Sequence, residues 1–178
     1  QALERAGWQA SDLDMIILAT ASADKYFPSS ACLLHNHLQL QTDIPAFDLN
    51  AACSGFIYAL SVADQYIKSG MKQRVLVVGV DALSRMVDWT DRKTCVLFGD
   101  GCGAVLLESS AQPGILGTCL HANGAYQEML YANNSIWGSE EQLVKMDGRA
   151  TFKVAVTKLG ESVDEILQQC NMRKQQVD

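Results

Sequence analysis

The order of apolar segments along this chain most constrains its fold, because short strand-like runs alternate with longer amphipathic stretches. The runs at residues 14–20, 46–49 and 75–80 have the length and β-branched content of buried strands. A helix opened by proline is expected at residues 28–40. The alternation predicts an α/β protein with a largely parallel sheet.

The second part of the chain continues the pattern. Residues 104–107 and 114–121 are predicted strands, and residues 151–170 form a long amphipathic helix with Phe152 on its inner face. The glycine-rich stretch at residues 98–104 lacks the Gly-Lys-Ser/Thr signature of a phosphate-binding loop, and a strand rather than a helix follows it. We therefore expect tight turns there and no nucleotide loop.

Residues 2–14 and 166–178 align without a gap, which indicates an internal repeat. Gly7 matches Asn171 at the presumed helix end, and these two residue types best tolerate a left-handed cap. We expect two similar α/β halves, with residues 1–110 in the first and residues 111–178 beginning the second. The first copy continues into a strand while the second ends the sequence, so both ends of the full fold are expected to be missing. Chance similarity of two helix ends is the alternative.

Cys53 is the principal candidate for catalysis. It lies where the apolar run at residues 45–50 turns into a helix with apolar residues three and four apart, for which Gly70 is the expected C-cap. Unpaired N–H groups and the helix dipole at such a position favour thiolate over thiol. The small neighbours Ala51 and Ala52 leave room for an acyl carbonyl. The alternative is a small buried hydrophobe, one of six cysteines.

Composition narrows the possible partners. The chain is 48% hydrophobic and 19% charged, which supports a packed core rather than disorder. The net charge of −6, without a Lys/Arg cluster, argues against nucleic acid. No run has the length of a membrane span and no secretory signal pattern is present, so we expect a cytoplasmic protein with reduced cysteines and no membrane contact.

Cys119 and His121 are candidate metal ligands, because they are two residues apart on a predicted strand and could share one face. The sequence contains no Cys-x-x-Cys pair and no second pair of ligands. Since zinc sites need three or four protein ligands, we expect no metal.

Six motifs carry a resemblance across the chain: FPSSACLL, IPAFDLNAACSGFIYALSVADQYIKSG, VLVVGVDALSR, DWTDRKTCVLFGDGCGAVLLE, HANG and MDGRATFKVAV. In this order they resemble the β-ketoacyl-acyl carrier protein synthase III family. The resemblance implies a thiolase-like fold of two similar halves in a layered α-β-α-β-α architecture. It also implies a homodimer that needs no cofactor beyond its CoA thioester substrate.

The resemblance implies a reaction as well. Cys53 takes an acetyl group from acetyl-CoA and condenses it with malonyl-acyl carrier protein, with loss of CO₂, a covalent strategy that divides one hard step into two. The family's supporting His and Asn lie outside this sequence, so the chain alone is expected not to complete condensation. The alternatives are a sibling condensing enzyme of specialised metabolism with another starter acyl group, or a non-catalytic core of the enzyme.

Further residues receive roles from the resemblance alone. Arg92 matches an arginine at the CoA adenine, and Lys153 a basic residue where the carrier protein docks. Arg149 replaces a smaller polar residue of a relative. Without the resemblance, the sequence indicates solvated surface charges at Arg92 and Lys153. It likewise indicates ordinary core residues at Leu83, Leu130 and Phe152. The remaining assignments are Gly148, Arg149 and Phe152 for CoA, and Phe27, Leu83 and Leu130 for the acyl pocket, with Phe27 reaching across the dimer interface.

Overall fold

A computed structural model describes residues 1–133 and 143–178 of the chain. The chain forms two compact units. We call Gln1–Asp81 with Asp100–Ile115 the first unit, and Ala82–Gly99 with Leu116–Asp178 the second unit. Each unit is described by itself below.

The first unit contains a four-stranded sheet in the order β2-β1-β3-β4. Strand β1 is parallel to both of its neighbours, and Ile16 pairs with Ala46 on one side and with Leu76 on the other. All of β1 is buried, as expected for the centre of a parallel sheet. The strands are β1 (Met15–Ala19), β2 (Ala46–Leu49), β3 (Arg74–Ala82) and β4 (Asp100–Glu108).

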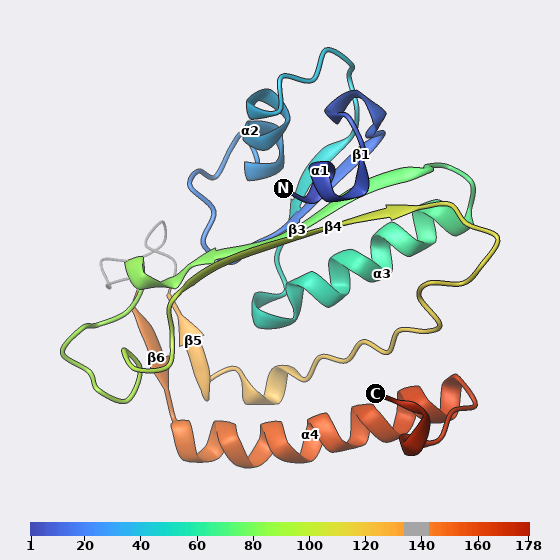
Figure 1. Cartoon of the computed structure of the whole chain (residues 1–178). Coiled ribbons are helices and arrows are strands. Elements are labelled where there is room, and N and C mark those ends of the chain that lie inside the picture. Colours follow the sequence, from blue (N-terminus) through green and yellow to red (C-terminus); the bar gives the residue numbers. More distant parts are fainter. Residues whose placement is uncertain (134–142) are drawn as a thin grey trace. The chain divides into compact units, whose positions relative to one another are not determined.

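Alternate residues of the sheet point into two separate cores. Ile17 faces a core formed with Ala59 and Ala63 of helix α3 (Gly55–Lys68). Ile16 faces the opposite core, which includes Ala31 of helix α2 (Ser30–His37). Figure 1 accordingly shows α2 and α3 on opposite faces of the sheet. The two-residue repeat of a strand thus explains a three-layered α/β/α unit.

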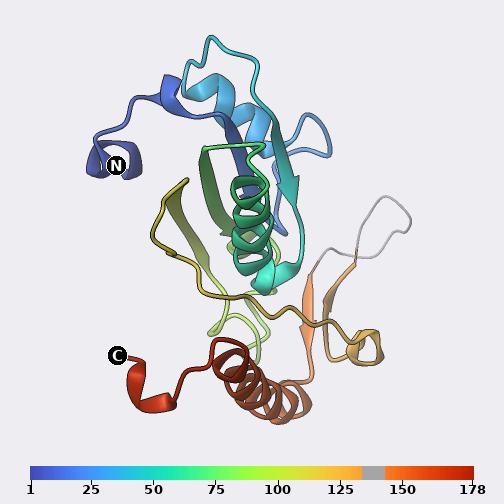
Figure 2. The same ribbon diagram turned by 90° about the vertical axis from the view of Figure 1, so that its right-hand side faces the viewer.

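The second unit is built around a long helix, α4 (Gly148–Gln169). The antiparallel strands β5 (Leu130–Ala132) and β6 (Val144–Met146) precede it, and the chain passes from β6 into α4 as Figure 2 shows. Asp147 starts the helix by accepting a hydrogen bond from the Ala150 N–H at 3.0 Å. Short 3₁₀ turns complete the unit at Leu83–Arg85, Gly124–Tyr126 and Lys174–Gln176.

The first unit also begins with two short elements, α1 (Ala2–Ala6) and a 3₁₀ turn at Ala10–Asp12. Within the described residues, no helix combines the length and the apolar character that crossing a bilayer requires.

Most predicted elements are confirmed, including the three parallel strands and the helices at 28–40, after Cys53 and at 151–170. The predicted strand at residues 114–121 is wrong. A strand needs a neighbour for its backbone groups, and this segment pairs with no described strand. It lies against α4, since a Cβ added at Gly117 would lie 2.9 Å from Cys170 Sγ. The glycine-rich stretch belongs largely to β4, and the predicted division near residue 110 stays a prediction.

Candidate active site

Cys53 lies in a 3₁₀ turn, Ala52–Ser54, between the end of β2 and the start of α3. Its side chain is exposed. Ala52 has a φ of 46°, and its N–H donates to Asn50 Oδ1 at 3.0 Å. A left-handed conformation at a residue other than glycine costs about 1 to 3 kcal/mol and is concentrated at functional sites. The backbone here is bent sharply so that the thiol emerges at the amino end of α3.

Two glycines hold the start of α3 close to the sheet. Gly55 is buried, and a Cβ at this position would lie 3.2 Å from Ala19 Cβ. A Cβ at Gly79 would lie 3.0 Å from Cδ2 of Phe56, the second residue of α3. A side chain at either position would push its neighbour away by a few tenths of an ångström, so glycine favours this close approach of helix and strand. The position of Cys53 is therefore fixed by packing as well as by the turn.

Two carboxylates lie at or near the ends of the parallel strands. Asp48 near the end of β2 accepts hydrogen bonds from the Ser30 and Ala31 N–H groups, each at 2.7 Å, and so stabilises the start of α2. Asp81 near the end of β3 accepts from the Ala21 N–H at 2.8 Å and from Ser22 Oγ at 3.0 Å. Sequence reasoning missed both residues. The available signal was an acidic residue next to the end of an apolar, strand-like run.

The loop that carries Arg92 belongs to the second unit, and Arg92 itself is exposed. Asp88 accepts hydrogen bonds from the Thr90 N–H at 2.8 Å and from Thr90 Oγ1 at 2.7 Å. The hydrogen bond from the Thr90 side chain lowers the pKa of Asp88, and the backbone N–H adds to this effect. Asp91 Oδ1 likewise accepts a hydrogen bond from the Lys93 N–H at 3.0 Å. Turns of this kind, in which an Asp side chain accepts from the backbone two residues on, stabilise the local conformation of the loop.

A pocket of about 750 Å³ lies in the second unit and has a mixed charge. Three cationic side chains lie at its surface, Lys93, Lys145 and Arg149, together with the acidic Glu128 and Asp147. Gly148 also lines it, whereas Phe152 does not. The structure thus brings Gly148 and Arg149, two of the predicted CoA residues, to the same pocket as Lys93, which follows Arg92 in the sequence. The other lining residues are Leu97, Tyr131 and Met146.

The remaining predicted residues are spread over both units. Phe27 in the first unit is 84% exposed and Phe152 on α4 is 71% exposed, so neither is a core residue of its unit. Lys153 is exposed on α4. Leu83 is partly buried, and Leu130 in β5 is at the border of exposure at 37%. The roles assigned to these residues from the resemblance stay predictions.

Comparison with known proteins identifies the relatives of this chain. Residues 47–124 match the family described as 3-oxoacyl-[acyl-carrier-protein (ACP)] synthase III. The chain is 53% identical to a β-ketoacyl-[acyl-carrier-protein] synthase III of Coxiella burnetii over 179 aligned residues, which cover 100% of this chain and 56% of the relative.

Solved structures agree. A 3-oxoacyl-[acyl-carrier-protein] synthase III from Aquifex aeolicus matches with a TM-score of 0.89 and 46% identity, over 97% of this chain and 54% of that one. The priming β-ketosynthase of the R1128 polyketide biosynthetic pathway also matches with a TM-score of 0.89, at 29% identity, over 96% of this chain and 53% of that one. The chain therefore spans about half the length of the relatives it matches.

The matched structures identify the fold class of this chain, which is the α/β, thiolase-like fold of the condensing enzymes, as predicted. Within that class, the resemblance to the β-ketoacyl-acyl carrier protein synthase III family is confirmed over the whole length of the chain.

Proposed function

We propose that this chain carries the nucleophile of an initiating condensing enzyme, which accepts an acetyl group from acetyl-CoA on Cys53 and transfers it to malonyl-acyl carrier protein. The single observation that carries the proposal is the geometry at Cys53. An exposed thiol follows a strained alanine and precedes a helix whose first residue is packed against the sheet.

In the first half-reaction, the Cys53 thiolate attacks the thioester carbonyl of acetyl-CoA, and the CoA thiolate leaves with the electron pair of the broken C–S bond. Cys53 lies two residues before Gly55, the first residue of α3, so its thiol stands at the amino end of that helix. In the second half-reaction, malonyl-acyl carrier protein loses CO₂, and the resulting enolate carbon attacks the acetyl carbonyl. Cys53 leaves as thiolate, and acetoacetyl-carrier protein is the product.

The pocket of the second unit supports binding of CoA. Its cations Lys93, Lys145 and Arg149 offer charge for phosphate groups, and Gly148 permits close approach of a ligand to the backbone. Arg92 lies one residue before Lys93 and is exposed, as an arginine that stacks on an adenine ring must be. Docking of the acidic carrier at Lys153, the homodimer and the cytoplasmic location remain parts of the proposal.

The test is isolation of the acyl-enzyme. The protein is incubated with isotopically labelled acetyl-CoA, digested and analysed by mass spectrometry. We expect one acetyl group, on the peptide that contains Cys53, and complete loss of labelling in Cys53→Ala. Cys32 and Cys102 provide matched controls because both are also exposed. Labelling should persist in Cys32→Ala and Cys102→Ala.

Equal labelling of Cys32, Cys53 and Cys102 would contradict the proposal, because it would show reactivity by exposure alone. The expectation that this chain alone does not complete condensation is tested separately, by comparing acetoacetyl-carrier formation by the chain and by a full-length relative such as the Coxiella burnetii protein. Removal of an oxyanion donor typically costs on the order of 10² to 10³ in rate. Comparable turnover would contradict that expectation.

A second candidate, a sibling condensing enzyme with another starter group, is favoured by the match to the priming β-ketosynthase of a polyketide pathway. The two candidates differ in the acyl-CoA that loads Cys53 fastest. Competition between acetyl-CoA and longer or branched acyl-CoA substrates distinguishes them, since a preference for a longer starter would favour the second.

A further inference from the structure

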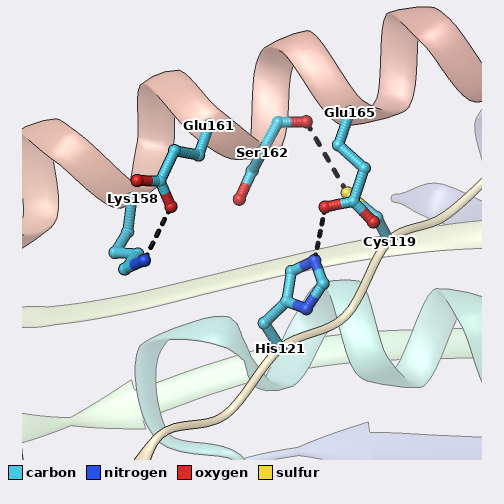
Figure 3. Close-up of polar contacts among 6 residues, drawn as sticks. All are labelled: Cys119, His121, Lys158, Glu161, Ser162 and Glu165. Atoms are coloured by element: carbon cyan, nitrogen blue, oxygen red, sulfur yellow. Dashed lines mark hydrogen bonds and ion pairs between the residues drawn. The ribbon is translucent and has the colours of Figure 1, made fainter.

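The second unit contains a cluster of three metal-binding side chains that has no part in the proposed reaction. Cys119, His121 and Glu165 each offer one ligand atom, and these atoms lie within 4.8 Å of one another. Figure 3 shows Cys119 and His121 on the stretch at residues 116–121, which we call the extended segment, facing Glu165 on α4. We propose that these residues form a zinc site that ties the extended segment to α4.

The backbone explains why the cluster forms. Cys119 and His121 are two residues apart, and Figure 3 shows both side chains directed toward α4. Cys119 Sγ donates to the Ser162 carbonyl oxygen at 3.7 Å, which holds the thiol against α4. Glu165 follows Ser162 by three residues and therefore lies on the same helix face. Its Oε2 lies 2.7 Å from His121 Nε2.

The ligand spacing suits a small tetrahedral ion. Zinc binds sulfur at about 2.3 Å and nitrogen or oxygen at about 2.0 to 2.2 Å, so neighbouring ligand atoms of a tetrahedral site are about 3.3 to 3.7 Å apart. Small side-chain rotations of the cluster reach this geometry, because the ligand atoms are already within 4.8 Å. The side chains of His121 and Glu165 are 61% and 48% exposed, so an ion can enter from solvent.

The chemistry of the ligands selects zinc over other common ions. A thiolate is a poor ligand for magnesium or calcium, whereas thiolate, imidazole and carboxylate together suit zinc. Binding releases the Cys119 thiol proton to solvent as the Zn–S bond forms. Three protein ligands leave the fourth position for water.

The neighbouring acidic residues of α4 are engaged elsewhere. Glu161 pairs with Lys158 at 2.6 Å, and Asp164 pairs with Lys174 at 2.6 Å. Figure 3 shows the Lys158 pair one helical turn before Glu165. Glu161→Gln is therefore a matched control for Glu165→Gln, because both remove one exposed carboxylate from the same helix.

The test is a titration of the reduced, chelator-treated protein with Zn²⁺ against a chromophoric chelator. We expect one strong site per chain, and at least about a tenfold loss of affinity in Glu165→Gln, since even outer partners of metal ligands contribute 10- to 100-fold. The affinity of Glu161→Gln should match that of the parent. Equal loss in both variants would overturn the proposal, because it would show nonspecific attraction to acidic surface.

Cobalt provides a second measurement, and its first reading uses the parent protein. Co²⁺ bound by Cys119 should give a thiolate-to-metal charge-transfer band and the intense visible bands of a tetrahedral site. The charge-transfer band should vanish in Cys119→Ser and persist in Cys170→Ser. Its absence in the parent protein, or its persistence in Cys119→Ser, would overturn the proposal.

Discussion

Gly7 and Asn171 occupy equivalent left-handed positions in two turns with the same hydrogen bonds. Their φ angles are 68° and 53°. The Gly7 N–H donates to the Glu4 carbonyl oxygen, and the Asn171 N–H donates to that of Gln168 at the matching position. The next residues repeat the agreement, since Trp8 donates to Leu3 and Met172 to Leu167. The aligned sequences at residues 2–14 and 166–178 thus share a local structure, as a true repeat requires.

The left-handed φ of Gly7 predicts that substitution of glycine by alanine has opposite effects on stability at Gly7 and at Gly160. Gly7→Ala should lower the free energy of unfolding by about 1 to 2 kcal/mol, because alanine resists a left-handed φ. Gly160→Ala should raise it by about 0.5 to 1 kcal/mol, because Gly160 is interior to α4 and alanine favours helix. Neither added Cβ meets an atom within 4 Å, so packing does not confuse the comparison.

Urea unfolding of both variants measures the two effects. Gly114→Ala is the control, since Gly114 has no positive φ and its Cβ would also meet open space. A neutral Gly7→Ala would contradict the expectation, because it would show that alanine adopts this left-handed φ without a cost in stability.

The elements that the sequence predicted correctly are those whose signal is local. Strand β1 is buried on both faces and so reads as an unbroken apolar run, and helix α3 has its apolar residues at helical spacing. Strands β5 and β6 were missed because three residues each are too few to show alternation. The wrong strand at residues 114–121 has the apolar character of a strand, but composition does not reveal whether a pairing partner exists.

The candidate site divides in the same way. Cys53 was predicted because strand, turn and helix are consecutive in sequence. Asp81 was missed because its partner Ala21 is 60 residues away, and Glu165 was missed because its partner His121 is 44 residues away. Such pairs depend on the packing of whole elements, which one sequence does not encode in any short pattern.

Asp48 provides a test of how β2 positions α2. Asp48→Ala should destabilise the protein by about 1 to 3 kcal/mol, because the Ser30 and Ala31 N–H groups lose their acceptor in a partly buried place. Asp48→Asn should cost less, because one side-chain oxygen still accepts. Chemical denaturation followed by circular dichroism measures both, and equal stability of Asp48→Ala and the parent would contradict the expectation.

The Asp88 turn should depend on pH in a defined direction. Hydrogen bonds from Thr90 lower the folded-state pKa of Asp88 below its ordinary value of 3.8. The stabilisation of the loop is therefore complete at pH values above the unfolded-state pKa, and it is lost as the pH falls through the lower, folded-state pKa. An NMR titration of the Asp88 carboxyl carbon should give a midpoint below 3.8.

Thr90 provides the control for that titration. Thr90→Val removes the hydroxyl donor and should raise the midpoint of Asp88, whereas Thr90→Ser keeps the donor and should leave it low. A midpoint at or above 3.8 in the parent protein would show that the Thr90 bonds do not stabilise the carboxylate.

Arg92 tests the proposed binding of CoA in the second unit. Loss of a cation over an aromatic ring at an exposed site costs about 0.5 to 2 kcal/mol, so Arg92→Ala should raise the KM for acetyl-CoA about 2- to 30-fold. The readout is acetylation of Cys53, and its rate at saturating acetyl-CoA should remain as in the parent, because a contact made equally in ground and transition states affects KM alone. Arg5→Ala removes another exposed arginine and should leave the KM for acetyl-CoA unchanged. A fall in the rate of acetylation at saturation would show that Arg92 does more than bind the nucleotide.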